Sequence, residues 1–151
     1  MREYKKYSCI NCNKESRFKY SGSNLYCGQT CQLEFQYKKY ITDWKAGCNL
    51  GGNKYATSNH VKRYILEKFD QTCCECKIKS VYNGKPIILE IDHIDGNPYN
   101  NNEENLRCIC PNCHSQSHNY KNKNKGNGRA YRTKYYAHHS PCSSVGRAPV
   151  L

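Results

Sequence analysis

The chain has 151 residues, enough for one modest domain or two very small ones, and its formal net charge is +12. Leu, Ile, Val and Phe together make up only 23 of the 151 residues, which excludes a fold held by hydrophobic burial alone. The 12 cysteines instead favour metal-stabilised modules, and the positive charge favours an anionic partner such as nucleic acid.

The cysteines are expected to be reduced. The opening residues, MREYKKYSC, contain no apolar signal core, and no run of the sequence is long enough to span a membrane. We therefore expect a cytoplasmic protein without a membrane partner, whose thiols do not form disulfides. In such a protein, Cys-x-x-Cys pairs are typical of metal sites.

Residues 1–45 are predicted to form an N-terminal four-cysteine zinc finger. Two close pairs of thiols, separated by the turn-rich KYSGSN, suit one tetrahedral zinc ion. The expected ligands are Cys9, Cys12, Cys27 and Cys31. The last of them is predicted to lie on a helix that continues through QLEFQYKKYI. The alternative is two unrelated pairs of reduced cysteines.

Residues 46–59 contain several Gly and Asn residues and are predicted to be a linker. The sequence HVKRYILEKF follows, with an apolar residue at every fourth position, which is the pattern of an amphipathic helix. Either Ser58 or Asn59 could cap its first turn.

A second zinc ion is predicted in the following part of the chain. Its expected ligands are Cys73, Cys76, Cys110 and Cys113, with Cys74 as a possible substitute. Between the two pairs, KPIILEID is strand-like and HIDGNPYNNNEE is rich in turn residues. Pro111 suits the first turn of a helix that runs toward Tyr120.

Acidic and imidazole side chains surround this second cysteine set. Adjacent residues on a helix point about 100° apart, so His114 must face away from a zinc ion bound by Cys113. His114 could therefore face the end of the strand that carries Asp92 and His93. On a regular strand, however, these two neighbours would point to opposite sides. Glu90 could share the side of Asp92, but a surface carboxylate is the favoured interpretation.

The stretch DHIDGNPYNNNEENLRCICPNCHS resembles the HNH endonucleases, particularly those of phages and introns. The resemblance extends from about Cys73 to Arg129. It implies an α+β fold. A small zinc-stabilised ββα-metal nuclease domain, here in residues 60–136, would follow the N-terminal finger in the chain.

The resemblance also implies roles for individual residues. His93 would be the general base, and Asn105 would brace the loop and hold the imidazole. Asp92 and His114 would bind one catalytic divalent cation, with Mg²⁺ or Mn²⁺ as the expected ion. His118, one helix turn after His114, is expected on the same helix face. It could be a further ligand, as in colicin-like members of the superfamily; a phosphate contact or plain exposure is the alternative.

No acidic residue follows Glu104, and the end of the predicted nuclease domain is strongly basic. We expect this segment to be an arm that contacts the DNA backbone. The residues expected to bind DNA are Lys121, Lys123, Lys125, Arg129, Arg132 and Lys134. Residues 137–151 are predicted to be a tail without regular structure.

The sequence therefore predicts a metal-dependent endonuclease that cuts double-stranded DNA, of the phage homing type, acting in an infected bacterial host. The chain departs from many phage homing enzymes because no helical repeat module follows the nuclease segment. A zinc-finger protein that binds DNA without cutting it is an alternative of another class. An RNA-directed nuclease would use the same residues.

Overall fold

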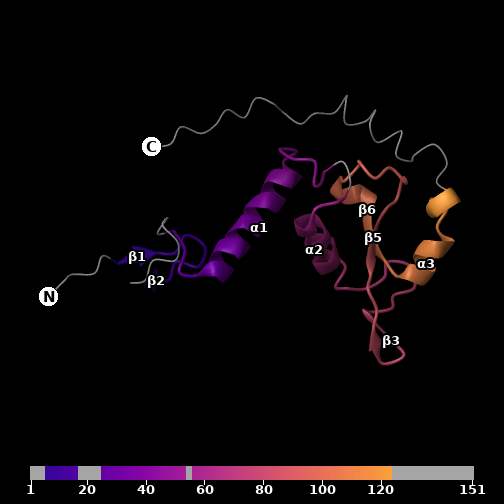
Figure 1. The fold of residues 1–151 in the computed structure, drawn as a ribbon, viewed down its shortest axis with the longest axis horizontal. Helices are drawn as coiled ribbons and strands as arrows, with labels where there is room; N and C mark the ends of the chain where they lie inside the picture. Colours follow the sequence, from indigo (N-terminus) through magenta and orange to yellow (C-terminus); the bar gives the residue numbers. More distant parts are fainter. Residues whose placement is uncertain (1–5, 17–24, 54–55, 124–151) are drawn as a thin grey trace. The chain divides into compact units, whose positions relative to one another are not determined.

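The structure, a computed structural model, describes residues 6–16, 25–53 and 56–123. The chain divides into two compact units, residues 1–42 and 43–151, and their elements are labelled in Figure 1. In the described part of the chain, no helix combines the length and the apolar character needed to cross a bilayer.

The first unit contains a pair of short strands and most of a long helix. β1 (Tyr7–Ser8) pairs antiparallel with β2 (Glu15–Ser16), and α1 spans Gln29–Lys45, with the unit boundary inside it. The helix expected after the last cysteine of the finger is confirmed, and it begins before that cysteine.

The segment predicted to be a linker, residues 46–59, is instead part of the second unit. Its described residues form a bridge between Gly52 and Thr57, and Gly51 and Thr57 are buried. The described residues of this segment therefore pack within the second unit.

The amphipathic helix predicted next is confirmed as α2 (Asn59–Lys68). Ser58 is its cap, because the Ser58 side chain accepts a hydrogen bond of 3.1 Å from the backbone N–H of Val61. Val61 and Ile65 are fully buried on the face that packs against the central strands.

Those strands are β5 (Glu90–His93) and β6 (Leu106–Ile109), which pair antiparallel and precede the short helix α3 (Pro111–Gln116). In Figure 1, α2 lies to the left of β5 and α3 to its right. The predicted α+β class is confirmed, and the order strand, strand, helix places β5 and α3 side by side. A short 3-10 helix, η1 (Glu103–Asn105), leads into β6, and another, η2 (Lys121–Lys123), follows α3.

The single strand expected over KPIILEID is two separate strands. β4 (Lys85–Pro86) turns back onto β3 (Val81–Tyr82), and β5 begins only at Glu90. Asn83 and Gly84 both have positive φ angles, of 50° and 71°, which suits the tight turn of such a hairpin. The strand β6 was not predicted from the sequence.

α3 is shorter than expected and ends at Gln116 rather than near Tyr120. The backbone of Ser117 is extended, with a ψ angle of 150°, and its hydroxyl donates to the carbonyl oxygen of His114 at 2.7 Å. This bond occupies a carbonyl at the end of the helix, so the chain leaves the helical path before His118.

Candidate active site and zinc sites

The four cysteines of the second predicted set lie together. The sulfur atoms of Cys73, Cys76, Cys110 and Cys113 are all within 4.8 Å of one another, and those of Cys76 and Cys110 are 3.7 Å apart. Four sulfurs at about 2.3 Å from a tetrahedral zinc ion would lie about 3.8 Å apart. The second set therefore has the spacing that can hold zinc.

The first predicted set has the same property. The sulfur atoms of Cys9, Cys12, Cys27 and Cys31 also lie within 4.8 Å of one another. The Cys12 and Cys27 sulfurs are 3.7 Å apart, and those of Cys27 and Cys31 are 3.4 Å apart. Cys48, Cys74 and Cys108 belong to neither set, and Cys142 is outside the described residues.

Both sets begin with the same backbone turn. The N–H of Asn13 donates to the carbonyl of Cys9 at 2.8 Å, and the N–H of Lys77 donates to that of Cys73 at 3.1 Å. Asn13 and Lys77 have positive φ angles of 58° and 61°, which close the chain around each Cys-x-x-Cys pair.

Backbone N–H groups stabilise a thiolate on the first cysteine of each set. Burial raises the pKa of Cys73, but the backbone N–H groups of Cys110, Cys76 and Glu75 outweigh it and lower the pKa to about 6. The pKa of Cys9 is likewise lowered to about 6. Burial raises this pKa, but the surrounding backbone N–H groups lower it by a larger amount. Zinc binds the thiolate, so these donors favour metal binding.

Asp92 occupies the centre of the β5–β6 pair and is buried. It lies directly opposite Arg107, whose Nε and Nη2 donate to Asp92 Oδ2 at 2.9 and 2.8 Å. Arg107 also pairs with Glu75 through Nη1, at 2.8 Å. This pairing fixes one carboxylate oxygen of Asp92 and leaves Oδ1 for another partner.

That other partner is His114 on α3, whose Nε2 lies 3.5 Å from Asp92 Oδ1. The other nitrogen of the ring, Nδ1, contacts a carboxylate oxygen of Glu90. Glu90 and Asp92 share one face of β5 because side chains alternate along a strand. The ring of Tyr120 packs edge-on against His114, with centroids 5.0 Å apart.

This arrangement has the donor set of a cation site. An ionised carboxylate only accepts hydrogen bonds, so Glu90 selects the His114 tautomer that carries its proton on Nδ1. The lone pair of Nε2 then faces Asp92 Oδ1, and two acceptors at 3.5 Å attract each other only through a proton or a cation. Two ligands about 2.1 Å from one cation lie about 3 Å or more apart, which the observed separation fits.

His93 faces away from this pair, as alternation along β5 requires. Its Nε2 lies 2.9 Å from the side-chain oxygen of Asn101, and its backbone carbonyl accepts from Asn119 Nδ2 at 2.5 Å. The structure thus pairs Asp92 with His114, and it pairs His93 with Asn101. Asp92 and His114 approach each other directly, whereas His93 is linked to this pair only as the neighbour of Asp92 on β5.

Asn105 was expected to brace the loop and to hold the imidazole of His93. Its Nδ2 donates to Asp95 Oδ1 at 2.9 Å and to the carbonyl of Asn100 at 2.7 Å, and its Oδ1 accepts from Asp95 N at 3.0 Å. These bonds brace the loop. Both N–H groups of the amide are engaged there, and Asn101 holds the imidazole instead.

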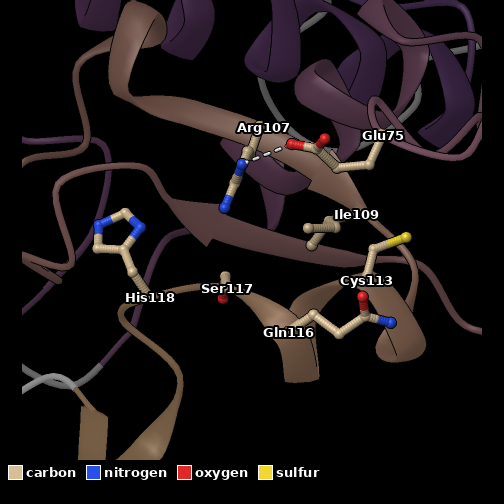
Figure 2. Close-up of a pocket in the computed structure, with 7 residues that line it drawn as sticks. All are labelled: Glu75, Arg107, Ile109, Cys113, Gln116, Ser117 and His118. Atoms are coloured by element: carbon tan, nitrogen blue, oxygen red, sulfur yellow. Dashed lines mark hydrogen bonds and ion pairs between the residues drawn. The ribbon is translucent and has the colours of Figure 1, made fainter.

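His118 lies apart from the Asp92–His114 pair because α3 ends before it. It lines a pocket of about 260 Å³ together with Arg107, Ser117 and Gln116, and Figure 2 shows Arg107 between His118 and Glu75. Among the described residues, the groups of three or more ligand atoms within 4.8 Å are the two cysteine sets. The expectation that His118 shares the helix face of His114 is therefore wrong.

Only two of the six residues expected to bind DNA lie in the described part of the chain. Lys121 places its ammonium 4.9 Å from the centre of the Tyr120 ring, and Lys123 donates to the carbonyl of Ser115 at 3.4 Å. The others lie outside the described residues, namely Lys125, Arg129, Arg132 and Lys134.

Arg107 and Asn101, which contact predicted site residues, were not predicted from the sequence, and Glu90 was interpreted as a surface carboxylate. For Glu90 a signal existed, since it lies two positions before Asp92. For Arg107 there was none, because its position opposite Asp92 depends on the unpredicted strand β6. Asn101 could not be distinguished from the other asparagines of its loop.

Comparison with known proteins gives one similarity. The chain is 46% identical over 54 residues to the H-N-H endonuclease F-TflIV of Escherichia phage T5. The match covers 36% of this chain and 23% of the relative, so the chain spans less than a quarter of that protein. No protein-family model matches the chain, and no solved structure matches it significantly. Over these 54 residues, the similarity confirms the resemblance of the chain to the HNH endonucleases.

Proposed function

We propose that the chain is a metal-dependent HNH endonuclease that hydrolyses phosphodiester bonds of double-stranded DNA. The observation that carries the proposal is the 3.5 Å approach of His114 Nε2 to Asp92 Oδ1. Glu90 and Arg107 occupy the remaining atoms of the two side chains, so both lone pairs are directed at one place. Asp92 and His114 would hold the catalytic cation there.

His93 is the proposed general base. A neutral imidazole accepts a proton readily near neutral pH. Attack on phosphorus takes place in line with the departing oxygen, so the base and the cation belong on opposite sides of the phosphate. The alternation of Asp92 and His93 along β5 supports this division of roles.

The proposed cation is Mg²⁺ or Mn²⁺. When bound, it would supply positive charge for a phosphoryl oxygen and for the leaving oxygen. One carboxylate and one imidazole leave most of an octahedral shell for water and phosphate oxygens. Arg107 holds the other oxygen of Asp92, which leaves Oδ1 for this role.

The two cysteine sets are proposed to bind one structural zinc ion each. The second set holds the start of α3, and with it His114, against β5. The first set, together with the basic residues after α3, would bind the DNA duplex. Within the HNH endonucleases we propose a phage homing enzyme that acts in the bacterial host; the phage source of the relative supports the phage origin.

A plasmid assay tests this function. Zinc-loaded protein with Mg²⁺ or Mn²⁺ is expected to nick or linearise supercoiled DNA. His93→Ala should reduce the rate by about 10²–10⁴-fold, the usual contribution of a general base, while DNA binding is kept. Asn102→Ala is the matched control, since Asn102 is exposed and its side chain makes no capping bond.

The same assay separates the alternatives. Binding without cutting by the wild type, or equal cutting by wild type and His93→Ala, would reject the proposal in favour of a protein that only binds DNA. Preferred cutting of structured RNA over duplex DNA would assign the site to RNA.

A further inference from the structure

Asn101 is buried beside the candidate active site, and both ends of its side-chain amide form hydrogen bonds. It is only 3% exposed. Its Nδ2 donates to the carbonyl of Leu50 at 3.0 Å, its Oδ1 accepts from the hydroxyl of Thr57 at 2.9 Å, and its backbone carbonyl accepts from Trp44 Nε1 at 2.9 Å. The remaining contact, from Oδ1, is the one to His93.

These bonds determine which way the amide of Asn101 points. A backbone carbonyl can only accept a hydrogen bond, so the atom that faces Leu50 must be the NH₂ group. The oxygen therefore faces Thr57 and His93. Because an amide oxygen has no proton to give, the bond to His93 requires a proton on Nε2 of the imidazole.

We propose that Asn101 is a positioning residue that holds His93 with Nε2 protonated and Nδ1 free to accept a proton. The inference rests on the proposed function for the statement that His93 is the general base. It adds which nitrogen is basic, and which residue of this chain selects it. Asn105, which the HNH resemblance implied for this role, braces the loop instead.

The segment before α2 makes this arrangement rigid. A Cβ at Gly51 would lie 2.5 Å from Trp44 Nε1 and 3.1 Å from the Cβ of Asn101, and Gly51 has a φ angle of +67°. A Cβ at Gly52 would lie 2.5 Å from the backbone oxygen of Ala56. The Gly-Gly pair therefore lets the backbone come close enough for the carbonyl of Leu50 to meet the amide of Asn101.

The proposal is tested first on the wild-type protein. Zinc-loaded, ¹⁵N-histidine-labelled protein is examined by NMR at about pH 8.5, roughly two units above the ordinary imidazole pKa. The His93 signals are assigned by their loss in His93→Ala. The expected spectrum has a resolved proton on Nε2, slowed in exchange by the bond to Asn101, and a bare Nδ1. A proton on Nδ1 would overturn the proposal.

Variants then separate positioning from a structural role. Asn101→Ala removes the acceptor, and should lose the Nε2 proton signal and lower kcat on the order of 10²-fold with little change in KM. Asn101→Asp keeps an acceptor oxygen for His93, and in its protonated form the other oxygen can still donate to Leu50, so it should restore the proton signal and most of kcat. The matched control, Asn102→Ala, should behave as the wild type in both measurements.

Each result has one meaning. A wild-type spectrum and kcat in Asn101→Ala would overturn the proposal, as would equal losses in Asn101→Asp and Asn101→Ala in folded, zinc-loaded protein. If Asn101→Ala fails to fold, the wild-type spectrum and the aspartate variant still decide. If the wild type cuts no nucleic acid, the proposed function fails, whereas the spectrum continues to test the role of Asn101.

Discussion

His114 on α3 and Asp92 on β5 face each other, with Nε2 of His114 3.5 Å from Oδ1 of Asp92. A further charged residue contacts the far side of each side chain. Glu90 contacts the far nitrogen of His114, and Arg107 holds the far oxygen of Asp92. The arrangement of the pair thus depends on two further side chains, those of Glu90 and Arg107.

Glu90 is therefore expected to matter for metal binding more than for folding. Glu90→Ala frees the His114 ring to rotate and to change its tautomer, and should weaken Mn²⁺ binding by about 10–100-fold. The thermal stability should change little, because the Glu90 side chain is 45% exposed. Calorimetric titration with Mn²⁺ measures the affinity. Glu104→Ala, which removes an exposed carboxylate, is the control. Equal Mn²⁺ affinity in Glu90→Ala and the wild type would refute this role.

Cys76 is expected to be essential for folding of the second unit. A structural zinc ion contributes on the order of 10 kcal/mol, comparable with the whole stability of a small domain. Cys76→Ser should reduce the bound zinc from two ions to one and remove helical circular dichroism. Cys74→Ser is the neighbouring control, because Cys74 lies outside the four-sulfur group. Zinc content unchanged in Cys76→Ser would show that the second set is not a zinc site.

The sequence predicted the residues whose roles depend on spacing or on a motif. The cysteine sets are recognisable because a tetrahedral ion requires close pairs, and Asp92, His93 and His114 stand in a recognisable order. The partners of these residues depend on the register between strands, which the sequence did not reveal. Arg107 is opposite Asp92 only because β6 pairs with β5.

Two other limits of prediction have local causes. His118 was expected on the face of His114 because the helix was assumed to continue, but the hydroxyl of Ser117 ends it. Asn101 and Asn105 are the same residue type in one loop. Only the position of the loop over Leu50 and Thr57 separates the residue that holds His93 from the one that braces the turn.

Glu103 is expected to stabilise the second unit over a predictable pH range. Lys68 donates to the carboxylate of Glu103 and lowers its pKa below the ordinary value of 4.5. Burial raises this pKa, whereas hydrogen bonds from Tyr64 and Lys45 lower it. Because the folded-state pKa is the lower one, the stabilisation is fully present above about pH 4.5 and is lost as the pH falls through the folded-state value.

Glu103→Gln should therefore lower the free energy of unfolding by about 1 kcal/mol, a modest value because the lysines are partly exposed. Urea unfolding at about pH 6 and about pH 8 measures the difference from the wild type, in a range that avoids acid release of zinc. The difference should be the same at both pH values. A difference that shrinks between about pH 8 and about pH 6 would contradict the lowered pKa of Glu103.

The basic residues after α3 are expected to contribute charge rather than sequence recognition. DNA binding should weaken steeply with salt, because each phosphate contact releases counterions. Replacing Lys121 and Lys123 together with Ala should reduce the salt slope by about 2, as measured by fluorescence anisotropy. Lys79→Ala should leave the slope unchanged, since the Lys79 ammonium already pairs with Asp70 at 3.5 Å. A slope unaffected by the double replacement would exclude these lysines from the interface.

The central claim is that His114, with Asp92, binds the catalytic cation. Pulsed electron paramagnetic resonance of Mn²⁺ bound to zinc-loaded, ¹⁵N-histidine-labelled protein tests it most directly, because a directly bonded imidazole nitrogen gives a characteristic coupling. The account predicts this coupling in the wild type and in His118→Ala, and its loss in folded His114→Ala. A coupling that persists in His114→Ala, or is absent from the wild type, would contradict the account.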